Sequence, residues 1–189
     1  MFGNYQFGIA GLTFYQDPIV DIDSQAFSTP NVMNYLTYLS ISHSNLTSFP
    51  QAIQSLPQLT TFYLMYSLIK HLPPDSFNTG TFGNLRTLRI YYNAQLTTMA
   101  SYAFRGLTNL TTLDLSSNAI SLIPQKAFAG LNSISSITLY GNNILVIQSG
   151  AFQSIPLKSL TVAFGKSSTL LLEIFKISNC YSMSSERCN

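Results

Sequence analysis

The stretch from Leu110 to Phe128, LTTLDLSSNAISLIPQKAF, carries the pattern that decides the fold. Counting Leu110 as place 1, apolar residues occupy places 1, 4, 6, 11 and 14, asparagine occupies place 9 and phenylalanine place 19. The spacing returns unchanged from Ile134 to Phe152, and from Leu85 to Phe104 with one extra residue. Further units begin at residues 9, 36, 59 and 157, so seven units follow one another about 25 residues apart. A period of this length predicts a stacked repeat architecture.

The apolar places predict one short parallel strand in each unit. Places 4 and 6 alternate with polar residues, which is the period of a strand buried on one face. An asparagine at place 9 can point inward and pair backbone groups that would otherwise be buried unpaired, so Asn93, Asn118 and Asn142 are expected to form a ladder. Ser44 and Ser67 are weaker substitutes at that place and Asp17 is a charged one, which predicts a less regular amino-terminal half. A column of phenylalanines, with Ile53 as its exception, is expected to fill the core opposite the sheet.

These units resemble the leucine-rich-repeat family, whose pattern is L-x-x-L-x-L-x-x-N-x-L. Trailing Ala-Phe pairs, such as Ala103-Phe104 and Ala127-Phe128, resemble the subtype common in extracellular proteins. The resemblance implies an α/β solenoid: a horseshoe with a parallel β-sheet on its concave face and short helical or irregular segments on its convex face. The Tyr- and Thr-rich repeats also resemble, loosely, the non-catalytic leucine-rich-repeat subunit of crustacean luciferase. We expect the solenoid to cover residues 1–172 and a cap or tail to cover residues 173–189.

Composition argues against several classes of function. The chain has 189 residues, a net charge of +2 and only 8% charged residues, so no basic face for nucleic acid is expected. No apolar run approaches the ~20 residues that span a bilayer. No cofactor or metal motif is present, and His43 and His71 lie more than one repeat apart in the sequence. Acid–base catalysis needs titratable groups that converge in one pocket, so an enzyme is not expected.

The two ends depart from a complete solenoid. Terminal coils need a polar cap, and residues 1–8 are too few and too apolar to supply one. We therefore expect an amino-terminally truncated fragment, which would also explain why no signal peptide is visible. Near the other end, Cys180 and Cys188 lie in a Ser-rich tail. A disulfide between these cysteines, two free thiols and a lost partner cysteine all fit the sequence.

The candidate binding site is the concave face, where places 3, 5, 7 and 8 of each unit point away from the core. Seven of the eleven tyrosines fall on these places, and no Lys or Glu does. Tyr, Met and Arg are enriched in protein interfaces, whereas Lys and Glu are depleted. Tyr and Thr also simply suit strands, which is the competing structural explanation. The predicted partner-binding residues are Tyr15, Tyr38, Tyr63, Met65, Tyr66, Arg89, Tyr91, Tyr92, Asp114 and Tyr140.

The functional hypothesis is a non-enzymatic recognition module that binds another protein, such as a receptor, matrix protein or enzyme subunit. A non-catalytic subunit of a secreted enzyme complex and a cytoplasmic adaptor are the alternatives. Two N-x-S/T sequons, at Asn45 and Asn109, permit N-glycosylation, although chance alone predicts about three from this composition. An extracellular or cell-surface location is expected from the repeat subtype.

Overall fold

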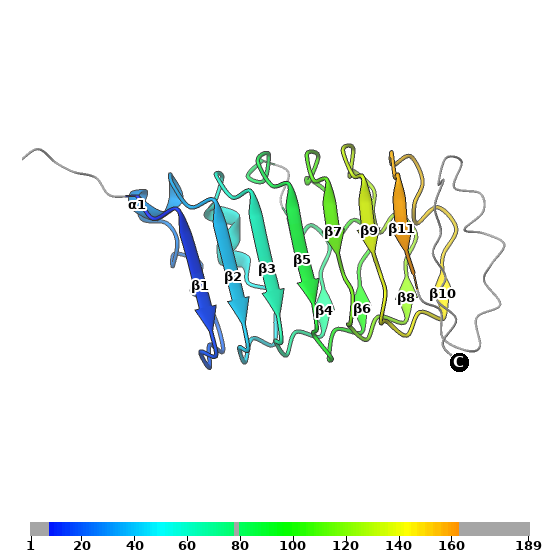
Figure 1. The fold of residues 1–189 in the computed structure, drawn as a ribbon, viewed down its shortest axis with the longest axis horizontal. Helices are drawn as coiled ribbons and strands as arrows, with labels where there is room; N and C mark the ends of the chain where they lie inside the picture. The colour runs from blue at the N-terminus through cyan, green and yellow to red at the C-terminus, as the bar shows by residue number, and fades with distance from the viewer. Residues whose placement is uncertain (1–7, 78–79, 163–189) are drawn as a thin grey trace, which may run out of the picture.

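The computed structural model describes residues 8–77 and 80–162, and these form a solenoid of about six turns. One strand from each coil joins a single parallel sheet, in which the strands lie side by side in chain order (Figure 1). The strands are β1 (Gly11–Tyr15), β2 (Tyr38–Ser42), β3 (Thr61–Met65), β5 (Thr87–Tyr91), β7 (Thr112–Asp114), β9 (Ser136–Thr138) and β11 (Ser159–Thr161). The predicted leucine-rich-repeat architecture is confirmed, and the strands begin at place 3 of each unit.

The return path of each coil contains little regular structure. Two-residue strands pair behind the main sheet, β4 (His71–Leu72) with β6 (Thr98–Met99) and β8 (Leu122–Ile123) with β10 (Val146–Ile147). Among the described residues, helix is confined to α1 (Pro30–Met33) and a 3-10 turn, η1 (Gln51–Ser55). Short segments on this side were expected, but the paired strands were not. They arise because the apolar residue at place 14 of each coil packs directly on its counterpart in the next.

The core consists of columns of identical places. Leu39, Phe62, Leu88 and Leu113 hold place 4 on neighbouring strands in register, and all four are fully buried. The phenylalanine column stacks as predicted, with ring centroids 6.1 Å apart from Phe77 to Phe104, 5.9 Å from Phe104 to Phe128 and 4.8 Å from Phe128 to Phe152. In the coil without a phenylalanine at this place, Ile53 is fully buried, and Phe49 meets the Phe77 ring edge-on at 5.1 Å. Burial of each large apolar side chain stabilises the fold by about 1.5–3 kcal/mol.

The asparagine ladder is confirmed in detail. Asn118 Nδ2 donates to the carbonyls of Ile90 at 2.7 Å and Leu115 at 2.8 Å, while its Oδ1 accepts from the Asn93 backbone at 2.9 Å. Asn142 makes the equivalent bonds to Leu115 and Leu139. Each rung therefore joins two coils through groups that would otherwise be buried without a partner.

The expectation of a less regular amino-terminal half is wrong for the strands. β1, β2, β3 and β5 have five residues each, whereas β7, β9 and β11 have three. In the later coils the side-chain amide at place 9 donates to the carbonyl at place 6 of its own coil, which is that of Leu115 or Leu139. Asn93 donates instead to the carbonyl at place 7, that of Tyr91. Asn93 Oδ1 also pairs with the Ser67 backbone and hydroxyl. Ser44 is the weaker substitute that the sequence predicts, because its buried hydroxyl has no hydrogen-bond partner among the described residues.

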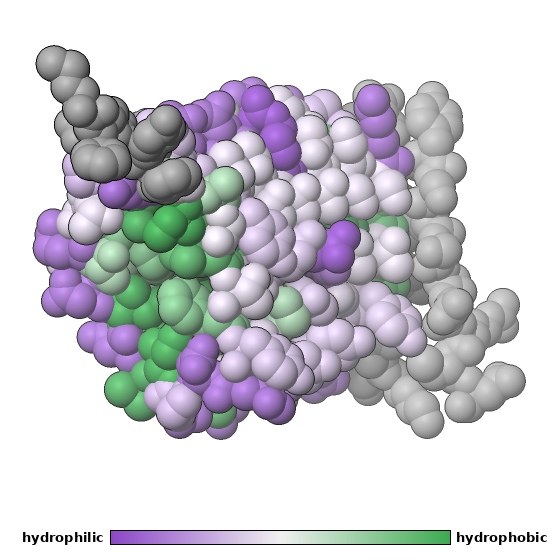
Figure 2. All heavy atoms as spheres, turned by 60° about the vertical axis from the view of Figure 1, so that its left-hand side comes forward, coloured by the Kyte–Doolittle hydropathy of each residue, from purple (hydrophilic) through white to green (hydrophobic). Residues whose placement is uncertain are grey.

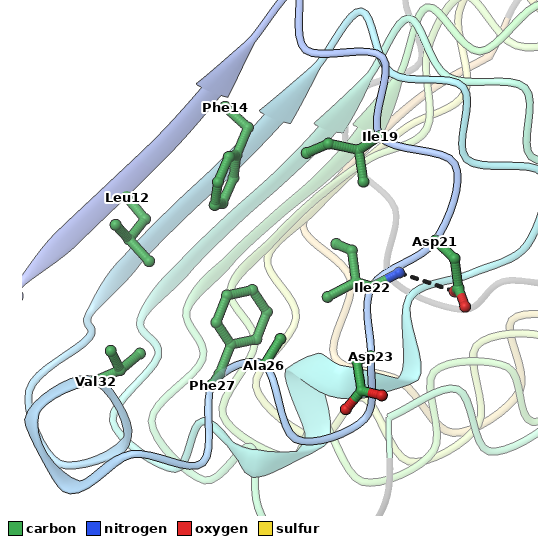
Figure 3. Close-up of a pocket in the computed structure, with 9 residues that line it drawn as sticks. All are labelled: Leu12, Phe14, Ile19, Asp21, Ile22, Asp23, Ala26, Phe27 and Val32. Atoms are coloured by element: carbon green, nitrogen blue, oxygen red, sulfur yellow. Dashed lines mark hydrogen bonds between the residues drawn. The ribbon is translucent and has the colours of Figure 1, made fainter.

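The amino-terminal end of the described solenoid exposes apolar side chains (Figure 2). Leu12 and Phe14 of β1 face Ile19, Ile22 and Phe27 across a cavity of about 360 Å³ (Figure 3). Leu12 and Phe14 are only half-buried, unlike their fully buried counterparts Leu39 and Ile41 on β2. In the part of the chain that the structure describes, no helix is long and apolar enough to cross a membrane.

Candidate functional site

The candidate site lies on the outward side of the seven-stranded sheet, formed by places 3, 5, 7 and 8, which we call the sheet face. Alternating burial along β3 and β5 shows that these places point away from the core. At place 5, Tyr63, Arg89 and Asp114 lie in register on three adjacent strands. The guanidinium carbon of Arg89 lies 5.2 Å from the centre of the Tyr63 ring, which is the range of a cation–π contact. Tyr38 meets the same ring edge-on at 5.6 Å.

A second row of rings runs along the ends of the strands, with three rings at place 8 and two at place 7. His43 stacks on Tyr66 with centroids 4.3 Å apart, and Tyr66 stacks on Tyr92 at 5.1 Å with nearly parallel planes. Tyr15 meets His43 edge-on at 5.3 Å, and Tyr91 lies 5.3 Å from Tyr92. We call the five rings of Tyr15, His43, Tyr66, Tyr91 and Tyr92 the aromatic row. It continues the sheet face across the first four described coils.

The backbone at place 8 explains why these rings stack. His43, Tyr66 and Tyr92 have φ of 56°, 50° and 55°, in the left-handed region that non-glycine residues seldom adopt. Their coils are tied there by backbone bonds to the next coil, from His43 N to Met65 O and from Tyr92 N to Ser116 O, both 3.2 Å long. The repeated conformation gives each side chain the same direction, so the rings lie one above another.

The predicted residues differ in accessibility. Tyr15, Tyr66, Tyr92 and Tyr140 are exposed, with Tyr15 at 60%. Tyr38, Tyr63, Met65, Arg89, Tyr91 and Asp114 are half-buried. Ser40 and Ser42 also occupy outward places, yet both are buried. On the adjacent strand β3, the larger side chains of Tyr63 and Met65 lie in register beside them. Tyr140 lies two coils beyond Tyr91, and within the described ranges no ring contact joins it to the others.

The electrostatics of the site centre on Tyr91. Burial raises the pKa of the Tyr91 phenol above its ordinary value of 10.0, while the nearby Arg89 charge lowers that pKa and the Asp114 carboxylate raises it. The phenol therefore stays neutral and can donate a hydrogen bond throughout the physiological pH range. His43 belongs to this surface, as its outward place 8 predicts, although it is not among the predicted partner-binding residues. Its place in the unit, the same as that of Tyr66 and Tyr92, was the signal that could have identified it.

The described part of the site contains no recognisable catalytic set. Ser42 Oγ lies 2.7 Å from His43 Nδ1, but Ser42 is buried and no carboxylate bonds to the imidazole among the described residues. His71 pairs with Thr98 on the return side of the coil. No group of three His, Cys, Asp or Glu residues in the described ranges could hold a metal ion. Asp21 accepts a hydrogen bond from the backbone amide of Ile22 (Figure 3). Asp23 accepts one from the backbone amide of Gln25.

The two predicted glycosylation positions are both exposed. Asn45 follows the end of β2, and Asn109 precedes β7, where its Nδ2 donates to Gly83 O at 2.8 Å. Cys180, Cys188 and the whole predicted tail lie outside the described residues, as does the boundary at residue 172.

Comparison with known proteins addresses the family directly. A family model described as "Leucine rich repeat" matches residues 57–120 and 83–144, and a second model of the same description matches residues 35–56. The chain belongs to the leucine-rich-repeat family. Adenylate cyclase of Schizosaccharomyces pombe is 33% identical over 104 residues. This match covers 53% of the present chain and only 6% of the cyclase, so it carries no argument for cyclase activity.

Several solved structures share this fold, and three of them are complexes. A TLR13–ssRNA13 complex matches with a TM-score of 0.77 and 21% identity, covering 94% of this chain and 28% of the matched chain. The glycosylated Toll–Spatzle complex of Drosophila matches at 0.67 and 20%, covering 86% and 22%. The LRIM1/APL1C complex matches at 0.54 and 24%, covering 68% and 22%. The chain thus spans about a quarter of each matched chain, and identities this low show the fold alone.

Two consequences concern partners. The repeat family supports a protein–protein interaction module. The expectation that nucleic acid is excluded is not supported by the comparison, because one matched structure is a complex with single-stranded RNA. That expectation came from the overall charge of this chain and remains an argument about charge only.

Proposed function

We propose that this leucine-rich repeat is a non-enzymatic recognition module that binds another protein through its sheet face. The observation that carries the proposal is the aromatic row, which shares the sheet face with the Tyr63–Arg89 contact. The outward places of this face contain no Lys or Glu. Tyrosine supplies large contact area at low cost in side-chain entropy, and Arg and Tyr are frequent hot spots of binding energy.

The structural alternative for these tyrosines is that they only stabilise the sheet. Against it, Tyr66 and Tyr92 keep 44% and 47% of their surface exposed while sitting in a strained backbone conformation. Strain of this kind costs of order 1–3 kcal/mol and clusters at functional positions. An exposed ring returns little burial energy to offset that cost. A partner that covers the rings would supply it.

Photo-crosslinking tests the proposal, because a crosslinking side chain captures whichever protein covers it. Benzoylphenylalanine replaces Tyr91, or Tyr102 as the control, because Tyr102 is a tyrosine in the turn on the return side. We expect a specific crosslinked protein from position 91 and none from position 102. Tyr63→Ser with Tyr91→Ser should then abolish binding of that protein and shift the melting temperature by only a few degrees, as for half-exposed positions. Crosslinks from position 102 alone, or a large loss of stability in the double variant, would refute the proposal.

We further propose an extracellular or cell-surface location. The Toll–Spatzle structure of similar fold is a glycosylated form, and the sequon residues Asn45 and Asn109 are both exposed here. Expression in a cell line with a secretory pathway, behind a heterologous leader, should give a band that moves faster after glycosidase treatment. Asn45→Gln with Asn109→Gln should remove that shift. A wild-type chain that is secreted without any glycan would count against this location.

A further inference from the structure

Arg89 occupies the centre of the sheet face and is held in place by a ring. It is the middle residue of β5 and lies in register between Tyr63 on β3 and Asp114 on β7. Its guanidinium carbon is 5.2 Å from the Tyr63 ring centre, while the half-buried Tyr91 follows two residues later on the same face. A guanidinium stacked on an aromatic face loses little further side-chain freedom when it forms hydrogen bonds. Arg89 is therefore preorganised for a ligand.

Arg89 has no acceptor within the described residues. Its Nε is buried without a hydrogen-bond partner, and no protein group accepts from the two terminal nitrogens, which are not buried. Asp114 is in register on the next strand but turns to its own coil, where its Oδ1 accepts from Ser116 N at 2.9 Å. By contrast, the exposed Arg105 forms a two-bond ion pair with Asp75 at 2.8 and 2.9 Å. Because its terminal nitrogens are not buried and have no acceptor among the described residues, Arg89 can donate hydrogen bonds to an acceptor that a partner brings.

The charge pattern around Arg89 selects the kind of partner. Arg89 and Asp114 are the only Lys, Arg, Asp or Glu residues at the outward places of the described strands. Single-stranded nucleic acid needs a groove of several cations along its phosphates, and one arginine on the outward places of the described strands does not supply it. A single carboxylate among neutral side chains matches one guanidinium, and the planar fork of Arg suits a carboxylate in two-bond geometry. The hydroxyl-rich tyrosines around it suit neutral protein surface.

We propose that the protein partner places the carboxylate of one aspartate or glutamate side chain against the terminal nitrogens of Arg89, between Tyr63 and Asp114. This inference rests on the proposed function, because it assigns the partner chemistry at the centre of that same face. Asp114 then acts against partners that carry a second acidic group beside the first, since two carboxylates would repel each other.

A displayed library of random linear peptides, selected on the full chain, tests the proposal. Binders are first restricted to those lost in the Tyr63→Ser, Tyr91→Ser variant. We expect these peptides to be enriched in Asp or Glu at one position and to bind Arg89→Gln roughly tenfold or more weakly. Selection on Arg89→Glu should replace the acidic preference with Lys or Arg at that position. Arg86→Gln is the matched control and should change nothing, because exposed Arg86 precedes β5 and bonds to Gly83 O.

The outcomes separate the two proposals. Tyrosine-dependent peptides without acidic enrichment, or with enrichment unchanged by Arg89→Glu, would overturn the carboxylate inference and leave the sheet face as a binding surface. Selected peptides that never depend on Tyr63 and Tyr91, or no binders at all, would count against both. A fluorescent oligouridylate serves as the nucleic-acid arm. Binding of this probe that falls steeply with salt and is lost in Arg89→Gln would overturn the inference in favour of RNA.

Discussion

At the scale of single residues, place 9 shows how one side chain decides whether two coils are joined. Asn118 uses both ends of its amide, donating to Ile90 and Leu115 and accepting from Asn93. Ser44 holds the same place, but its buried hydroxyl has no partner among the described residues. A buried polar group without a partner destabilises the folded state. Truncation at Asn118 creates such groups, whereas truncation at Ser44 removes one, so the two changes should affect stability differently.

Asn118→Ala should lower the free energy of unfolding by about 3 kcal/mol, because it leaves backbone groups of two coils buried without partners. Ser44→Ala should leave stability within about 0.5 kcal/mol of wild type or raise it slightly, since it removes an unsatisfied hydroxyl. Urea titrations followed by circular dichroism measure both. Equal losses in the two variants would mean that the ladder contributes nothing beyond side-chain packing at this place.

At the scale of elements, the sequence predicts what the repeat pattern determines directly. The register of all seven strands follows from aligning place 3 of each unit, from Gly11 to Ser159. A strand period of two also predicts which side chains leave the core, so the outward position of Tyr63 and Arg89 needed no structure. The asparagine and phenylalanine columns followed for the same reason, because identical places in stacked coils must meet.

The arrangement of the aromatic row could not be predicted in the same way. It depends on a left-handed backbone at place 8, which residue types such as Tyr66 and Tyr92 give no reason to expect. Gly141 holds the same place with φ of 71°, and an added Cβ there would lie 3.0 Å from Ser117 Oγ. Among the residues at place 8, Gly141 gives the clearest sequence signal of a left-handed backbone, because glycine adopts positive φ without strain. Arg89 and Asp114 likewise form no ion pair, because Arg89 lies over the Tyr63 ring and Asp114 accepts from Ser116 N. Sequence spacing does not show which of these contacts is preferred.

At the scale of the whole molecule, a stacked solenoid is held together by contacts between neighbouring coils. In the described part of the chain, β1 has one neighbouring strand, β2, and β5 has two. Leu12 and Phe14 on β1 are half-buried around the open cavity, whereas Leu88 and Ile90 on β5 are fully buried. The stability of the chain should therefore be graded along its length, with the first coil opening before the coils that carry Tyr63 and Arg89.

Native-state hydrogen exchange measures this gradient. Amide protons of β1 that bond to β2 should exchange at least about a hundredfold faster than those of β5. A factor of a hundred corresponds to a difference of about 2.7 kcal/mol in the free energy of local opening. This is comparable to the stabilisation that one large apolar side chain gains on full burial. The ordered amides of β3 are the internal comparison, because β3 has two neighbours and shares the sheet face. Equal protection of β1, β3 and β5 would show that the solenoid opens as a single cooperative unit. In that case the exposed cavity beside Phe14 would not weaken the first coil, and the sheet face would be no more rigid than the end of the stack.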